Sequence, residues 1–102
     1  MNADFVARFG RRFIDTARER LAAAAGLDGE RPAEAARTLA LHLHSISGEA
    51  AMIGFAELSQ LARDTMGVAQ AAASGGASPA ECAAAVGTFA RAVDALEQTL
   101  PA

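Results

Sequence analysis

The 102-residue sequence contains no lysine, tryptophan or tyrosine, and it has a single cysteine. One cysteine excludes an internal disulfide, and no apolar run reaches the roughly 20 residues that would span a bilayer. The first residues lack the basic and apolar stretches of a secretory signal. The net charge of −3 argues against nonspecific binding to nucleic-acid phosphates, which needs concentrated positive charge. We therefore expect a cytoplasmic protein that binds neither nucleic acid nor a membrane.

What the sequence has in excess is alanine, which inflates the hydrophobic fraction to 52%. Alanine is the best helix former because it loses no side-chain entropy in a helix, and β-branched residues are sparse. The composition therefore predicts an all-α fold. The length predicts one domain, spanning residues 1–102.

Apolar residues that recur at three- and four-residue steps predict the first two helices. The first is expected over residues 3–25 and ends in the glycine-containing segment 26–29. Gly10 weakens it locally, which leaves open a short extra N-terminal helix before a longer one. The second helix is expected to begin at Pro32, since proline suits the first helical turn, and to end or bend at Gly54.

Two further helices follow in the second half of the sequence. The third runs from about Phe55 into the loop signal Ser74-Gly75-Gly76. The fourth opens with Ser78-Pro79-Ala80-Glu81, which has the pattern of a capping box. Cys82 falls on the apolar stripe of this helix and is expected in the core. Four amphipathic helices with short connections predict an antiparallel up-down four-helix bundle.

The only histidines are His42 and His44, both in the second helix. At about 100° per residue, His44 lies roughly 130° from the centre of the apolar stripe, so it should face outward. His42 lies only about 70° from that centre, at the edge of the buried face. The two rings point in nearly opposite directions and cannot share a metal ion, and no Cys or Glu cluster would complete a zinc site. We therefore expect no metal and no cofactor.

Small and apolar residues surround His44 on its own face of the helix. Gly48, one turn later, costs about 1 kcal/mol in a helix interior, and it leaves the imidazole uncrowded. The small residues are Ala40, Ser47, Gly48 and Ala51. Leu41 and Met52 also turn away from the core on this side. An exposed imidazole in a shallow apolar surface suits a docking partner, and we expect that partner to contact Ala40, Leu41, Ala51 and Met52.

The run from His44 to Leu58 resembles the histidine-containing phosphotransfer (HPt) family. That family's motif has a His, then Lys and Gly three and four residues later, then small and apolar residues at set spacings. The matching positions are His44, Gly48, Ala50, Gly54, Phe55 and Leu58. Two positions depart from the pattern: Ser47 replaces the Lys, and Met66 stands where a polar residue, often Gln, commonly lies on the next helix.

His42 is the alternative site, but its register does not fit the motif. It would place Ile46 where the glycine belongs and Met52 where Gly54 should be. We therefore interpret His42 as a histidine at the core boundary.

The resemblance implies that His44 accepts a phosphoryl group from the aspartate of a response-regulator receiver domain and passes it to another receiver. The expected partners are receiver domains and a hybrid histidine kinase, with the chain itself a monomer. Such a protein is a phosphoryl carrier in two-component signalling and not an enzyme, without ATP-dependent kinase activity. The alternative is a non-phosphorylated helical adaptor that binds a receiver or kinase domain through the same face.

Arg63 is our candidate for the role of the missing lysine. In an antiparallel hairpin that turns near Gly54, Ser47 should lie level with Arg63, His44 with Met66, and Ala40 with Gln70. The Arg63 guanidinium would then stand beside the lysine position, where it could bind phosphoryl oxygens in a bidentate fork. Gln70 could offer a hydrogen bond. Alternatively, Arg63 is an ordinary solvated residue paired with a nearby acid.

Overall fold

The computed structural model describes residues 3–101, and within that range it contains helices and no strand. Four α-helices and one 3₁₀ segment follow one another along the chain. They are α1 (Ala3–Leu21), η1 (Ala22–Asp28), α2 (Pro32–Ile53), α3 (Ala56–Ala73) and α4 (Pro79–Thr99). The all-α prediction is confirmed.

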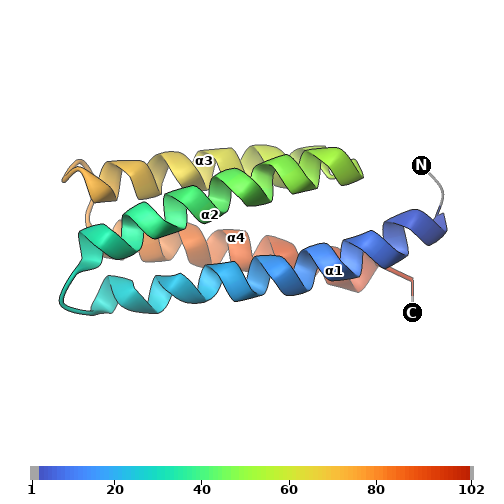
Figure 1. Ribbon diagram of the computed structural model, residues 1–102, viewed down its shortest axis with the longest axis horizontal. Coiled ribbons are helices and arrows are strands. Elements are labelled where there is room, and N and C mark those ends of the chain that lie inside the picture. The colour runs from blue at the N-terminus through green and yellow to red at the C-terminus, as the bar shows by residue number, and fades with distance from the viewer. Residues whose placement is uncertain (1–2, 102) are drawn as a thin grey trace.

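The four helices run up and down in turn, so that each is antiparallel to the next (Figure 1). The beginning of α1, the α2–α3 turn and the end of α4 lie at one end of the bundle. The molecule is a short rod of 43 × 19 × 16 Å. Within residues 3–101, no helix is both long and apolar enough to cross a membrane. The predicted antiparallel up-down bundle is confirmed.

All four helices contribute side chains to the core. The largest fully buried side chains are Ile14, Leu39, Leu43, Ile46, Cys82, Phe89 and Val93. Cys82 is therefore a core residue, as its place on the apolar stripe predicts. Burial raises the pKa of its thiol, because the charged thiolate is poorly solvated there.

The predicted helix ends are present in the structure. Pro32 occupies the first turn of α2. Ser78 and Glu81 form a reciprocal capping box: the Glu81 N–H donates to Ser78 Oγ at 3.0 Å, and the Ser78 N–H donates to Glu81 Oε1 at 3.2 Å. Gly54 ends α2 with a left-handed φ of 95°, and its N–H donates to the last carbonyls of the helix.

The N-terminal segment decides the alternative left open at Gly10, and it differs from the prediction at the end of the first helix. α1 is continuous through Gly10, so no separate short helix precedes it within the described residues. A Cβ at Gly10 would lie 3.3 Å from Leu100 and Phe55, so this glycine permits close packing and does not break the helix. The α-helix ends at Leu21 and not at residue 25, and the chain tightens into η1, whose Leu27 is buried in the core.

Arg18 links α1 to α4 at the surface. Its guanidinium donates to Glu97 at 2.9 Å and to Asp94 at 2.7 Å. The hydrogen bond from Arg18 lowers the pKa of Glu97 below its ordinary value. The stabilisation from the Arg18–Glu97 pair is present at pH values above the ordinary carboxyl pKa. It is lost as the pH falls through the lowered pKa of Glu97. Because the side chains are exposed, this pair contributes little to the free energy of unfolding.

The left-handed turn at Gly54 generates a stability prediction. Gly54→Ala should lower the free energy of unfolding by about 1–2 kcal/mol, because an L-residue in this conformation brings its Cβ against the following carbonyl oxygen. Urea denaturation followed by circular dichroism measures the change. Gly87→Ala in the interior of α4 is the matched control, and it should raise stability by about 1 kcal/mol. Equal effects of the two substitutions would contradict this account of the turn.

Candidate functional site

The packing of α2 places His44 on the surface. Leu43 and Ile46, which flank it in sequence, are completely buried, and His44 is exposed. Among residues 3–101 no group hydrogen-bonds to the His44 ring, so both nitrogens are open to an incoming group. His42 is half-buried, as expected for a boundary position.

The helix turn after His44 is open on its outer side. Gly48 is exposed, and a Cβ built there would meet no atom within 4 Å. Packing inside the protein therefore does not require glycine at this position, and α2 retains a residue that weakens it. Open space beside the imidazole is the consequence.

Leu41 and Met52 flank His44 and are largely exposed to solvent. Their exposed fractions are 70% and 79%, unusual for large apolar side chains. Met52 also borders a hollow of about 210 Å³ between α1 and α2, to which Phe9 contributes. The expectation that both side chains turn away from the core is confirmed. Of the two alanines expected in the same surface, Ala51 is exposed, whereas Ala40 is half-buried and packs on the core.

Ser47, at the position where the HPt motif has its lysine, is buried and faces α3. Its exposed fraction is 5%, and its hydroxyl donates to the His44 carbonyl oxygen at 2.7 Å. The side chain is thus used within the turn that carries His44. It does not present its hydroxyl to solvent.

Ser59 of α3 is a site residue that the sequence analysis missed. It is 2% exposed, and its hydroxyl donates to the Ser47 carbonyl oxygen at 2.8 Å, across the two helices. The pattern gives only a weak signal for it, since a serine on a helix stripe is common. Its role depends on which carbonyl of the neighbouring helix lies within reach.

Arg63 reaches this contact indirectly. Its Nη1 donates to Ser59 Oγ at 3.3 Å, and its Nη2 donates to Gln60 Oε1 at 2.9 Å. The α3 residue that hydrogen-bonds to Ser47 is thus Ser59, one turn before the expected Arg63. Arg63 is linked to Ser47 through the Ser59 hydroxyl. Within the described residues, no carboxylate lies within salt-bridge distance of Arg63.

The other expected neighbours on α3 are placed less closely. Met66 is half-buried and packs on the core, and Gln70 is exposed. The structure gives no hydrogen bond to the Gln70 side chain from another described residue. The level pairings of His44 with Met66 and of Ala40 with Gln70 stay predictions.

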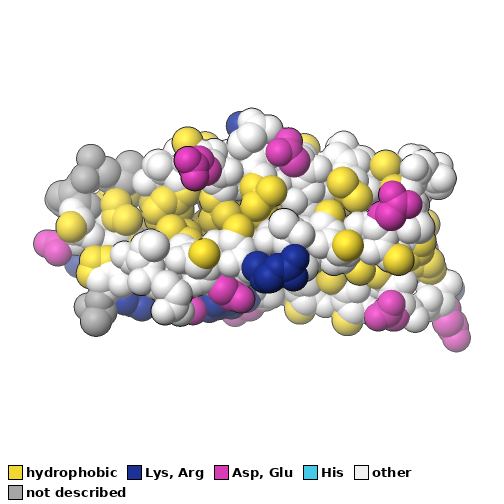
Figure 2. Space-filling view, turned by 180° about the vertical axis from the view of Figure 1, so that it is seen from behind, with side chains coloured by type: hydrophobic (Ala, Val, Ile, Leu, Met, Phe, Trp, Pro, Cys, Tyr) yellow, Lys and Arg dark blue, Asp and Glu magenta, His cyan; other side chains and the backbone are white. Residues whose placement is uncertain are grey.

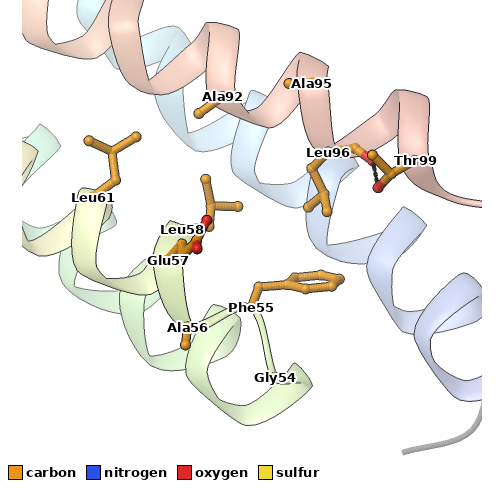
Figure 3. A pocket seen from close by; sticks show the side chains of 10 residues that line it. All are labelled: Gly54, Phe55, Ala56, Glu57, Leu58, Leu61, Ala92, Ala95, Leu96 and Thr99. Atoms are coloured by element: carbon orange, nitrogen blue, oxygen red, sulfur yellow. Dashed lines mark hydrogen bonds between the residues drawn. The ribbon is translucent and has the colours of Figure 1, made fainter.

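A groove lies between α3 and α4, at the end of the bundle where α3 begins. It measures about 670 Å³. In Figure 3, Leu58 and Leu61 of α3 point toward Ala92 and Leu96 of α4, and Glu57 is the only ionisable lining residue. The face in Figure 2 shows hydrophobic side chains and no histidine. The residues that line this groove thus include neither a histidine nor a basic side chain.

Metal-binding clusters are also absent from the described part of the chain: no three His, Cys, Asp or Glu side chains come together there. The candidate site thus consists of the exposed His44 imidazole, the neighbouring Gly48, and the exposed side chains of Leu41 and Met52. It also includes Arg63, which hydrogen-bonds to the Ser59 hydroxyl between α2 and α3. Such a surface offers a nucleophile and a positive charge. It offers no enclosed substrate pocket.

Comparison with known protein families agrees with this geometry. The family model described as the Hpt domain matches residues 9–99. Comparisons with curated proteins and with solved structures give no match. The Hpt domain is a phosphotransfer module of two-component signalling. Because the match spans nearly the whole sequence, the chain belongs to the Hpt domain family.

Proposed function

We propose that the protein is a phosphorelay intermediate that accepts a phosphoryl group on His44 from a receiver-domain aspartate and passes it to a second receiver. The observation that carries this proposal is the exposed, unbonded imidazole of His44 at the motif position, with open space over Gly48. We further propose that its partners are a hybrid histidine kinase and response-regulator receivers, and that it acts as a monomer in the cytoplasm.

The nucleophile of the transfer step is the neutral imidazole of His44. In a neutral imidazole one ring nitrogen carries the proton and the other has a lone pair available. That nitrogen attacks the phosphorus of the phospho-aspartate, the N–P bond forms as the O–P bond breaks, and the aspartate carboxylate leaves with the bonding electrons. The reverse step delivers the group to another aspartate. Phosphoryl transfer depends mainly on positioning and charge stabilisation, much of which the receiver supplies.

Arg63 is the residue of this chain that we propose to support the phosphoryl oxygens. Two observations support the assignment: its guanidinium lies two hydrogen bonds from the lysine position of the motif, and no carboxylate in residues 3–101 neutralises it. Arginine binds phosphoryl oxygens through a planar fork of N–H donors. Ser47 then keeps the His44 turn in shape, and Gln70 is a further hydrogen-bond donor on the same stripe of α3.

One observation favours a second candidate, a non-phosphorylated adaptor with the same docking face. Ser47 replaces the lysine of the motif, and its hydroxyl is already bonded within α2. An adaptor would bind a receiver or kinase domain through Leu41 and Met52 and take no phosphoryl group. Labelling by a phosphorylated receiver distinguishes the two functions.

The assignment of His44 predicts which variant takes the label. His44→Gln should remain folded, since the side chain is exposed, and should take no label from a phosphorylated receiver domain. His42→Gln is the matched control two residues away, and it should be labelled like the unchanged protein. Acid-labile ³²P incorporation measures both. Label retained on the His44 variant would rule out the site, and no label on the unchanged protein with a receiver that binds it would favour the adaptor.

A substitution at Gly48 separates stability from function. Gly48→Ala should raise the free energy of unfolding by about 1 kcal/mol, because alanine suits a helix interior and its methyl group meets no other atom. The same methyl should occupy part of the open space through which a receiver approaches His44, and it should slow transfer by about tenfold, a change of about 1.4 kcal/mol in the barrier.

Gly87→Ala in α4 serves as control for this experiment too. It should stabilise the protein similarly, with its new Cβ in ordinary contact with Arg91 at 3.6 Å, and leave transfer unchanged. Urea denaturation and rapid-quench labelling give the two quantities. A stabilised Gly48→Ala protein with the normal transfer rate would show that the space beside His44 has no functional role.

Charged substitutions at Leu41 and Met52 test where the partner binds. Leu41→Glu and Met52→Glu should each weaken receiver binding by about tenfold, because a carboxylate is placed at the apolar centre of the interface. Circular dichroism should be unchanged, since both side chains are exposed. Ala83→Glu adds the same charge to an exposed position of α4 and should bind normally. Normal binding by both variants, measured by isothermal titration calorimetry, would place the partner elsewhere.

A further inference from the structure

Ser59 is the buried hydroxyl that joins α3 to the helix turn carrying His44. Its Oγ donates to the Ser47 carbonyl oxygen at 2.8 Å, and the Ser47 hydroxyl in turn donates to the His44 carbonyl oxygen at 2.7 Å. Two successive side-chain hydrogen bonds therefore run from α3 into the backbone of the His44 turn. No buried side-chain nitrogen or oxygen atom in the described residues lacks a hydrogen-bond partner, and these two bonds satisfy both buried serine hydroxyls.

The chemistry of a hydroxyl determines what Ser59 offers to Arg63. A hydroxyl has one proton and two lone pairs, and the proton of Ser59 is used on the Ser47 carbonyl. Only lone pairs remain, and Arg63 Nη1 donates to them at 3.3 Å. Ser59 is thus a directed acceptor that draws the guanidinium from its own helix toward α2.

A second contact holds the guanidinium from the other side. Gln60 Oε1 accepts from Arg63 Nη2 at 2.9 Å, and the Gln60 amide is itself oriented by Asp64 Oδ1 at 3.0 Å. Arginine has five N–H donors, and these two contacts use two of them. The guanidinium is held in place by neutral acceptors, and donors remain for an anion.

We propose that Ser59 is a positioning residue for phosphoryl transfer, which holds the Arg63 guanidinium against the His44 turn so that its remaining N–H groups face the phosphoryl oxygens. This inference rests on the proposed function of His44 and Arg63. It gives the contact between α2 and α3 a part in the transfer step besides its part in the fold. Ser59 itself touches neither the imidazole nor the phosphoryl group.

A double-mutant cycle tests whether Ser59 acts through Arg63. Ser59→Ala and Arg63→Ala should each lower the transfer rate at saturating receiver by about fivefold to tenfold, with the receiver KM unchanged because Leu41 and Met52 remain. The double variant should be no slower than Arg63→Ala alone, since removing Arg63 leaves Ser59 nothing to position. A merely structural Ser59 would instead give multiplied effects in the double variant.

Thr65→Ala provides the matched control in the same helix. Thr65 is also buried, and its hydroxyl donates to the Leu61 carbonyl oxygen of α3 at 2.8 Å, so this hydrogen bond stays within α3. Its loss should leave the transfer rate unchanged. Ser59→Thr keeps the hydroxyl and should restore most of the rate. If Ser59→Ala does not fold, Ser59→Cys replaces it in the cycle, because a thiol is a weaker donor and acceptor.

The outcomes separate this inference from the proposed function. A normal rate in Ser59→Ala, multiplied effects in the double variant, or an equal loss in Thr65→Ala would overturn the role of Ser59, while labelling of His44 in the unchanged protein would still stand. A normal rate in Arg63→Ala would overturn the roles of both residues. Absence of label on His44 in the unchanged protein would overturn the proposed function itself.

Discussion

The rotation of α2 about its own axis is fixed by the side chains that it buries, and the site depends on that rotation. Leu39, Leu43 and Ile46 are fully buried, and each contributes about 1.5–3 kcal/mol relative to exposure. If α2 rotated about its axis by about 100°, the angle between successive residues, this apolar stripe would become exposed and other residues would take its place in the core. The same rotation that buries Leu43 therefore presents His44 to solvent. It also directs Ser47 toward α3.

Local signals were sufficient to predict most of the fold from the sequence. Pro32, Gly54 and the Ser78–Glu81 capping box each act within one helical turn, so their effect does not depend on the rest of the chain. The outward direction of His44 follows from the 3.6-residue period alone. The close approach of Phe55 and Leu100 to Gly10 could not be predicted, because these residues are distant from Gly10 in sequence.

The same distinction explains which parts of the site were predicted. The open space at Gly48 and the exposure of Leu41 and Met52 are properties of one helix, and the helical period was enough to place them. The contact of Ser59 with Ser47 depends on the relative axial position of two helices, within a few ångströms. The 3.6-residue period of a helix identifies the stripe of α3 that faces α2. It does not identify which residue on that stripe makes the contact.

The rod shape of the bundle has a consequence for how fast a partner can find the site. His44 lies in the middle part of α2, on a long side of a molecule measuring 43 × 19 × 16 Å, so most collisions present the wrong surface. With a net charge of −3, the chain has no strong positive field to steer an acidic partner. Association should then be limited by orientation, in the ordinary range of about 10⁵–10⁷ M⁻¹s⁻¹. Local concentration of the two partners would control the flux more than their mutual affinity.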